Sequence, residues 1–232
     1  MKLLITAATP DELLAARQVL TAFPAIDARC VVTGIGVTAT AYHTLKQLQS
    51  DTFDLVINIG IAGSFSDKLA IGDVCKVTKE YFGDTGIRTA AGFSTLFDEN
   101  LLNADTFPFQ SGALHAPELR IENEDAKSHL SSLISHLSIG HLPSVTGVTV
   151  QTVSGTSEQI EELRNRFSPD IETMESAAFF YVCLQEKIPF MALRAISNRV
   201  EPRDKSKWNI PLALNNLSAV LRPLFSACSI DE

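Results

Sequence analysis

Short apolar runs rich in β-branched residues recur along the chain, and they predict buried β-strands. These runs span residues 3–8, 29–33, 55–59, 74–78, 145–153 and 190–196. Helical spacing of apolar residues fills several of the gaps, over residues 10–20, 38–49, 158–167, 175–186 and 211–225. Because strands alternate with helices, the pattern predicts an α/β protein: a single three-layer α/β/α domain over residues 1–232, with a mixed, largely parallel central sheet.

Residues 83–117 follow neither pattern. The segment carries Gly, Ser, Thr, Asn and Pro together with Phe93, Phe97, Phe107 and Phe109. A loop this long in a compact domain is usually functional or disordered, and the phenylalanines argue against disorder. Two interpretations are open for residues 93–109: a lid or oligomer contact, or a loop that packs its own aromatic side chains on the surface.

Composition narrows the function classes. Of 232 residues 45% are hydrophobic and 20% charged, as in packed globular proteins, and with a net charge of −8 and no Lys/Arg-rich run nucleic acid is not an expected partner. The four cysteines form no CxxC pair and no zinc-type Cys/His cluster, which predicts no metal site and a reducing, cytoplasmic environment. The N-terminal apolar run ends at Ala8, too short for a signal peptide, and no run reaches the ~18 residues of a membrane helix.

The first motif that could carry chemistry is Thr9-Pro10-Asp11-Glu12, directly after the first predicted strand. As a capping box, Thr9 is the N-cap, Pro10 occupies the first helical position and Glu12 the third. This structural interpretation explains every residue of the motif. The junction also lies at the carboxyl edge of the sheet, where α/β proteins bind ligands, so Glu12 could orient and deprotonate a water there.

Two glycine-containing turns follow predicted strands. Residues 33–39 match the GxGxxG/A pattern, with Asp54 about 20 residues further on, as in a dinucleotide-binding fingerprint. That pattern normally follows the first strand of such a fold, which here has no glycine turn, so a tight turn is the simpler interpretation. In the second turn, residues 58–64, Gly60 and Gly63 permit close approach of the backbone to a flat or sugar-like ligand.

Polar residues also stand at two later strand ends. Glu175 opens an apolar helix, where it complements the helix dipole, and it is also suited to accept hydrogen bonds from vicinal sugar hydroxyls. Met174 would give the sugar a soft apolar wall. Asn198 follows Ser197 at the end of the last predicted strand, where the pair could form a turn, and the Asn198 amide can both donate and accept.

Taken together and in this order, the five segments resemble the purine nucleoside phosphorylase/nucleosidase superfamily. The resemblance covers residues 1 to about 224 and is strongest to its nucleosidase branch. Within that branch, Arg194–Asp204 followed by Trp208 is similar to the futalosine hydrolase family of the alternative menaquinone pathway.

The resemblance implies a role for most of these residues. Glu12 would position the attacking water, while Glu175 would bind the ribose hydroxyls and Met174 would lie under the sugar. The remaining substrate-binding positions would be Gly60, Ile61, Ala62, Gly63, Gln151, Thr152, Val153 and Ser197. Ile61 stands where relatives often have Ser or Thr. No cofactor is implied, and a homo-oligomer, most simply a dimer, is expected.

Asn198 departs from the adenine-specific members, which have an aspartate that protonates N7 of the base. An amide cannot deliver a proton, but its NH₂ can donate to N7 and O6 of a 6-oxopurine. The implied reaction is hydrolysis of futalosine with release of hypoxanthine. Arg88, Arg199 and Arg203 are candidates for its 5′ carboxylate, although each could be an ordinary surface arginine.

Two alternatives remain open. One is a nucleosidase for methylthioadenosine/S-adenosylhomocysteine or aminodeoxyfutalosine. The other, from a different class, is a non-catalytic or redox nucleotide-binding domain built on the glycines of residues 33–39.

Overall fold

The computed structural model describes residues 1–90, 92–117 and 141–228. The strands are β1 (Lys2–Ala7), β2 (Asp27–Val32), β3 (Leu55–Ser64), β4 (Val74–Phe82), β5 (Gly86–Thr89), β6 (Gly92–Thr95), β7 (Leu114–His115), β8 (Ser144–Thr149), β9 (Ile171–Thr173) and β10 (Phe190–Arg199). The helices are α1 (Pro10–Leu20), α2 (Val37–Ser50), α4 (Ser157–Phe167), α5 (Ser176–Gln185), α6 (Ile210–Cys228) and the 3₁₀ turn η1 (Lys205–Lys207). Each strand and helix predicted from the periodicity is present.

The α/β class is confirmed, and so is the mixed, largely parallel sheet. Strands β2, β1, β3 and β10 run parallel in that order, and β4–β8 and β8–β9 are also parallel pairs. Pairs β10–β4, β3–β9 and β4–β7 are antiparallel. Because β3 pairs with β10 along most of its length and with β9 at its end, strands β3, β9, β8, β4 and β10 close into a ring. The apolar pattern does not predict this closure.

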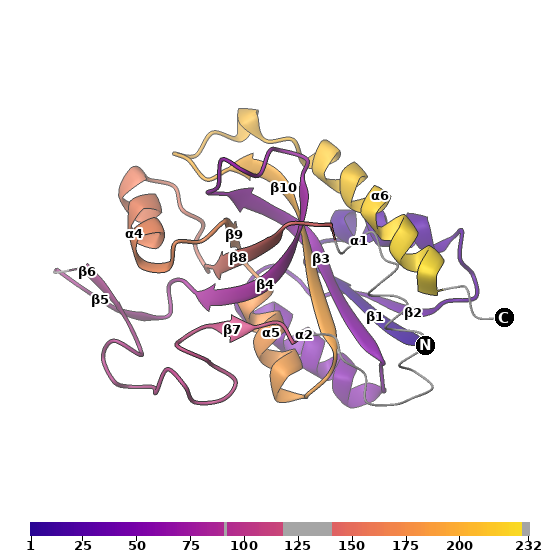
Figure 1. Ribbon diagram of the computed structural model, residues 1–232, viewed down its shortest axis with the longest axis horizontal. Helices are drawn as coiled ribbons and strands as arrows, with labels where there is room; N and C mark the ends of the chain where they lie inside the picture. Colours follow the sequence, from indigo (N-terminus) through magenta and orange to yellow (C-terminus); the bar gives the residue numbers. More distant parts are fainter. Residues whose placement is uncertain (91, 118–140, 229–232) are drawn as a thin grey trace.

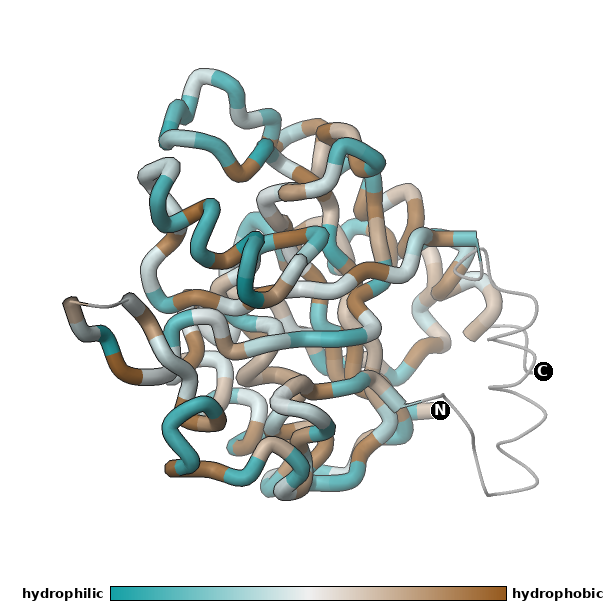
Figure 2. Tube along the Cα trace, turned by 60° about the vertical axis from the view of Figure 1, so that its left-hand side comes forward, coloured by the Kyte–Doolittle hydropathy of each residue, from teal (hydrophilic) through white to brown (hydrophobic). Residues whose placement is uncertain are grey.

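Helices cover the sheet on two sides, so the three layers are present. In Figure 1, α1 and α6 lie on one side of β1, β3 and β10, and α2 and α5 lie on the other. The first side buries Leu3, Leu13, Leu193 and Leu221 among other apolar residues, and the second buries aliphatic residues together with phenylalanines such as Phe179. Figure 2 shows the same distribution, with hydrophobic positions along the inner strands and hydrophilic positions in the outer turns.

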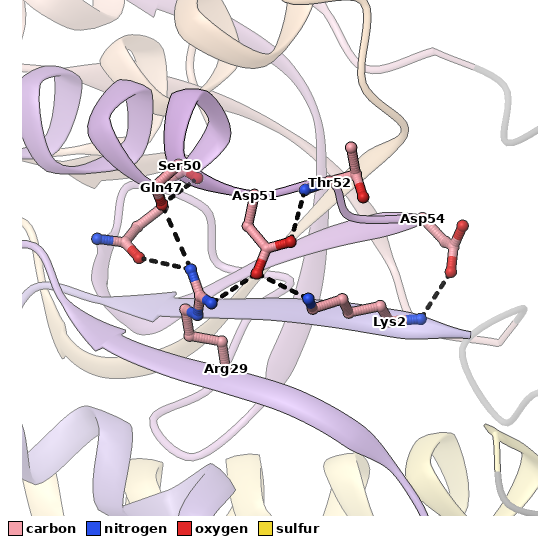
Figure 3. A network of polar contacts seen from close by, with 7 residues as sticks. All are labelled: Lys2, Arg29, Gln47, Ser50, Asp51, Thr52 and Asp54. Atoms are coloured by element: carbon pink, nitrogen blue, oxygen red, sulfur yellow. Dashed lines mark hydrogen bonds and ion pairs between the residues drawn. The ribbon is translucent and has the colours of Figure 1, made fainter.

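An ionic network holds the amino-terminal edge of the sheet, remote from the carboxyl ends. The Asp51 carboxylate accepts from Lys2 Nζ at 2.7 Å and from the Arg29 guanidinium at 2.6 Å. It thereby ties the end of α2 to β1 and β2, as Figure 3 shows. Asp54 accepts from the backbone N–H of Lys2 at 2.6 Å. Because these contacts fix the start of β1, they also fix the register in which its carboxyl end meets β3.

The segment 83–117 contains more regular structure than the sequence indicates. Strands β5 and β6 pair as an antiparallel hairpin, and β7 pairs with β4; residue 91 lies outside the described residues. Phe93 is buried beneath the guanidinium groups of Arg88 and Arg166. The rings of Phe97 and Phe109 meet edge to face, and Phe109 also contacts Phe82 and Tyr181. Three of the four phenylalanines of this segment therefore pack against other residues of the same chain. The fourth, Phe107, is 58% exposed.

Candidate active site

A pocket of about 240 Å³ opens at the carboxyl ends of β1, β3, β9 and β10. Residues predicted from the sequence to form the site line it: Glu12, Ile61, Ala62, Gly63, Val153, Met174, Glu175, Ser197, Asn198, Arg199 and Arg203. The topology explains this convergence. The loops that follow the parallel strands β1, β3 and β10 meet at one edge of the sheet, and β9, which is antiparallel to β3, reaches the same place by pairing with Gly63 and Ser64.

Glu12 forms the capping box and lines the pocket with the same side chain. Thr9 is the N-cap of α1; its hydroxyl oxygen accepts from the Glu12 N–H, and Glu12 Oε2 accepts from the Thr9 N–H at 2.9 Å and from its hydroxyl at 2.8 Å. The other carboxylate oxygen, Oε1, accepts from the Ile61 N–H at 3.0 Å. Three donors from two elements thus hold this carboxylate, which is 7% exposed. Glu12 therefore forms the capping box that the sequence predicts, and the same hydrogen bonds hold its carboxylate at the wall of the pocket.

Gly60 lets that carboxylate approach β3. A Cβ atom at this position would lie 2.9 Å from Glu12 Oε1 and 3.8 Å from Arg194 Cζ. Arg194 is 1% exposed and donates to the Leu193 carbonyl oxygen at 2.9 Å, to Ser176 Oγ at 2.8 Å and to the Asn58 carboxamide. Over the described ranges no carboxylate forms an ion pair with Arg194. A buried cation therefore lies beneath a pocket lined by carboxylates.

Glu175 is the N-cap residue of α5, but its side chain reaches across to another helix. Its Oε1 accepts from the Gly36 N–H at 3.0 Å, at the start of α2. Gly36 has φ +90°, a conformation that favours glycine. Burial raises the pKa of Glu175, and the Gly36 N–H and the positive charge of Arg194 oppose that rise in part. The glycine turn is thus a support for Glu175.

Asn198 reaches the pocket through a β-bulge. Ile196 pairs with Ala62 and Asn198 with Gly63, so Ser197 is the extra residue of β10. Asn198 Nδ2 donates to the Arg199 carbonyl oxygen at 2.8 Å, and Ser197 Oγ donates to Asn198 Oδ1 at 2.8 Å. A Cβ on Gly63 would lie 3.0 Å from Asn198 Nδ2. The bulge and the glycine together make room for the amide.

Four predicted site residues do not line the pocket. Gly60 lies behind Glu12, as described. Gln151 and Thr152 are exposed; Gln151 Oε1 accepts from the Val37 N–H at 2.9 Å and so caps α2. Arg88 lies on the β5–β6 hairpin, where it is paired with Glu162 at 2.7 Å.

The other two arginines differ in how they are engaged. Arg199 pairs with Asp67 at 2.5 Å and donates to the carbonyl oxygens of Leu69 and Ser66. Arg203 is exposed and its guanidinium lies 5.9 Å from the Trp208 ring centroid; within residues 1–90, 92–117 and 141–228 its side chain has no ion pair. Of these two, Arg203 is the one whose charge is uncompensated.

Sequence reasoning missed Glu172 and Trp208 as lining residues. Glu172 is 8% exposed, and its Oε2 accepts from Ser154 Oγ at 2.5 Å and from the Ser154 N–H at 3.3 Å. Burial raises the pKa of Glu172, and the contacts with Ser154 oppose that rise. No local pattern in the sequence marks Glu172, because the three residues of β9 are too few to show strand periodicity.

A second buried acid lies behind the pocket. Glu80 on β4 is fully buried, and its Oε1 accepts from Thr149 Oγ1 at 3.0 Å and from Thr173 Oγ1 at 3.4 Å. Its Oε2 has no partner in the part of the chain that the structure describes. Desolvation raises the pKa of Glu80 to about 8, against the opposing hydrogen bond from Thr149 and the charge of Arg194. At neutral pH Glu80 is therefore mainly protonated.

Two kinds of feature are absent from the residues that the structure describes. No helix among them is long and apolar enough to cross a membrane. Nowhere in these ranges do three or more His, Cys, Asp or Glu side chains gather closely enough to hold a metal ion.

The chain matches the model of a known protein family and several curated relatives. The model of the phosphorylase superfamily matches residues 4–226. The futalosine hydrolase of Acidothermus cellulolyticus is 30% identical over 203 residues, 87% of this chain and 76% of that protein. The enzyme of that name from Thermus thermophilus is 27% identical over 84% of this chain and 79% of its own. The 5′-methylthioadenosine/S-adenosylhomocysteine nucleosidase of Bacillus subtilis is 32% identical over 71% of this chain and 65% of its own.

Solved structures share the fold. The 5′-methylthioadenosine/S-adenosylhomocysteine nucleosidase of Colwellia psychrerythraea, in complex with adenine, superimposes with a TM-score of 0.72 at 23% identity, covering 98% of this chain and 96% of that one. The futalosine hydrolase of Helicobacter pylori gives a TM-score of 0.73 at 15% identity, covering 97% of each chain.

Proposed function

The chain belongs to the phosphorylase superfamily, and from this membership we propose that it hydrolyses the N-glycosidic bond of futalosine, as one domain, and releases hypoxanthine. The observation that carries the proposal is the meeting of Glu12, Glu175 and Asn198 in one pocket. A carboxylate for water, a carboxylate for a sugar and an amide for a base are the three groups that hydrolysis of a nucleoside requires.

Glu12 activates the water in this mechanism. Breaking the C1′–N9 bond leaves positive charge on the ribose and negative charge on the purine. The three hydrogen bonds to Glu12 fix its carboxylate, so it can aim a water at C1′ and take a proton as the C1′–O bond forms. The departing base regains a proton from solvent, and the free sugar retains the hydroxyl group.

Glu175 orients the ribose. Its Oε1 accepts the Gly36 N–H, and a carboxylate has about four acceptor positions, so positions remain for vicinal hydroxyl groups. The buried Arg194 lowers the electrostatic cost of two carboxylates in one pocket, and its charge opposes the rise in the pKa of Glu175. Met174, which lines the pocket beside Glu175, supplies an apolar surface for the sugar.

Asn198 stabilises the leaving purine. One N–H of its amide is engaged by the Arg199 carbonyl oxygen, and the second remains for N7 or O6 of the base. A donor fixed in place before reaction stabilises charge that develops on the base without transferring a proton.

Hydrolysis is favoured over phosphorolysis because the anion-binding positions near the pocket are already occupied. The first N–H groups of a helix are an anion site, but those of α2 bind Glu175 and Gln151. At α5, the Ala177 N–H donates to Thr149 Oγ1 at 2.8 Å. At the start of α1, the Glu12 side chain accepts the backbone N–H of the N-cap residue. Phosphate would have to displace these side chains.

A second candidate substrate class is the adenine nucleosides, because the Bacillus subtilis relative is named a 5′-methylthioadenosine/S-adenosylhomocysteine nucleosidase. The nucleotide-binding alternative has less support. The Gly36 and Val37 N–H groups that would bind a pyrophosphate are taken by side chains of this chain.

The proposal extends to the 5′ side and to the cell. Arg203, exposed at the pocket, fits a carboxylate on the 5′ substituent better than Arg199, whose donors are engaged. A homodimer is part of the proposal, with the segment 93–109 as lid or interface. The proposal places the protein in the cytoplasm, as expected from a sequence whose four cysteines form no CxxC pair, and the reaction would serve the alternative menaquinone pathway.

A base-release assay tests the function. The protein is incubated with futalosine, inosine and methylthioadenosine, with and without phosphate, and the released base is identified by chromatography. We expect hypoxanthine from futalosine at the same rate in both buffers. Release that requires phosphate would overturn hydrolysis, and adenine release at comparable kcat/KM would overturn the assignment of the base.

A further inference from the structure

Glu172 and Asn198 flank the same residue of β3. In the sheet register Glu172 pairs with Gly63 from β9, and Asn198 pairs with Gly63 from β10. Residues directly opposite one another project from the same face of a sheet, and neighbouring strands are about 4.8 Å apart. The carboxyl and the amide therefore stand about 10 Å apart at their Cα atoms, across a residue with no side chain. All three line the pocket.

The contacts of Glu172 do not account for its charge. Ser154 supplies every hydrogen bond recorded for its carboxyl, through the backbone N–H and the hydroxyl. None of the ion pairs recorded across the described residues involves Glu172. An ionised carboxylate has about four acceptor positions, so positions remain for a ligand in the pocket that Glu172 lines. Burying an ionised carboxylate without a cation is costly. A residue whose role was only to contact Ser154 would not need a charge.

The Asn198 amide does not by itself select a base. An asparagine can bind adenine through N6 and N7, and it can equally donate to N7 or O6 of a 6-oxopurine. Discrimination requires a second contact on the edge where the two bases differ. At that edge hypoxanthine carries an N1–H donor, whereas adenine carries an N1 lone pair.

We propose that Glu172 is the specificity-determining residue of this site, and that its carboxylate accepts the N1–H of a 6-oxopurine. The same carboxylate repels the N1 lone pair of a 6-aminopurine, so it acts by attraction to one base and by repulsion of the other. The proposal rests on the proposed function, because it assumes that a purine occupies the pocket. In this arrangement Asn198 stabilises the departing base, and Glu172 determines which base the site accepts.

The test compares two substrates that differ in the base alone, futalosine and aminodeoxyfutalosine. The wild-type protein should prefer futalosine in kcat/KM. Glu172→Gln should lose on the order of 10- to 100-fold on futalosine, the loss expected for one hydrogen bond to a charged group. It should retain or gain activity on aminodeoxyfutalosine, because the glutamine NH₂ can donate to N1. The preference should therefore move toward the 6-amino substrate.

Two control variants separate this role from a structural one. Ser154→Ala removes the hydroxyl that holds Glu172 but keeps the carboxylate, so it should lower the rate on futalosine by less than Glu172→Gln does and should not reverse the preference. Glu161→Gln changes an exposed carboxylate on α4 and should change neither rate. Inhibition by free hypoxanthine and adenine gives a binding readout for variants that turn over slowly, and circular dichroism verifies folding.

The failures can be told apart. If the wild-type protein releases no base from either substrate, the proposed function is wrong. If it cleaves futalosine but Glu172→Gln lowers both rates equally, or leaves the preference unchanged, the assignment of Glu172 is wrong while the function stands. Equal wild-type rates on the two substrates would also overturn the assignment.

Discussion

Replacing Glu80 by Gln should stabilise the protein at neutral and alkaline pH. Gln matches the shape of a protonated Glu and carries no ionisable proton. The pKa of Glu80 is raised from 4.5 to about 8, and the ordinary value of 4.5 is the one that applies when the chain is unfolded. Below pH 4.5 both states hold the proton and the pH has no effect. Above it the unfolded state ionises first, so folded-state stability falls as pH rises until the folded pKa is passed.

The magnitude follows from the same pKa. Each tenfold change in an acid constant is about 1.4 kcal/mol, so the free energy of unfolding should fall by about 3 kcal/mol between pH 4.5 and pH 7, and by about 5 kcal/mol above pH 8. Glu80→Gln should abolish this fall and leave the contributions of all other carboxyl groups unchanged.

Urea unfolding of both proteins at pH 5, 7 and 9 measures the difference directly. The gap in the free energy of unfolding between Glu80→Gln and wild type should widen with pH in favour of the variant. The slope against urea should stay the same, because the surface exposed on unfolding does not change. A gap independent of pH would refute the reasoning, since it would mean that Glu80 has the same pKa in both states.

Three further predictions concern the pocket. Glu12→Gln should lower kcat by about 10²- to 10⁴-fold in the base-release assay while thermal unfolding stays near wild type; a loss of stability with turnover retained would return Glu12 to capping alone. Gly63→Ala would set a Cβ 2.9 Å from Val200 and 3.0 Å from the Asn198 amide, so kcat/KM should fall and urea unfolding should show a cost of about 1–3 kcal/mol; wild-type kinetics would contradict this. Because the pKa of Glu175 is raised and its ionised form accepts ribose hydroxyls more strongly than its protonated form, kcat/KM should fall as pH drops through a pKa above 4.5, and Glu175→Gln should remove that limb; an unchanged limb would exclude Glu175 as its source.

Much of the fold is predictable because the chain is locally consistent. The capping box over Thr9–Glu12 requires only a strand before it and an apolar helix after it, and both patterns are short-range. The approach of Glu12 to the pocket follows from the same motif, since a helix that begins at the carboxyl edge of a sheet presents its first turn to that edge. Glu175 is predictable on the same grounds.

The remaining features depend on contacts between distant segments. The closure of the ring requires β3 to pair with both β9 and β10, and no periodicity records which strands pair. Glu172 is invisible as a lining residue until β9 is set against Gly63. Gln151 was expected in the pocket from the family resemblance, but its side chain caps α2 instead by accepting the Val37 N–H.

The extra residue in β10 makes the stabilisation of the leaving base depend on residue count as well as on residue type. Without Ser197 as the bulge, regular pairing would bring Ser197 opposite Gly63 and carry Asn198 one position further, where its side chain would point to the other face of the sheet. A shift of one residue in this strand would therefore remove the amide from the pocket without changing its identity. In related chains, the number of residues between Arg194 and this position therefore matters as much as the residue type, because an insertion or deletion there can remove the donor to the leaving base as effectively as a substitution.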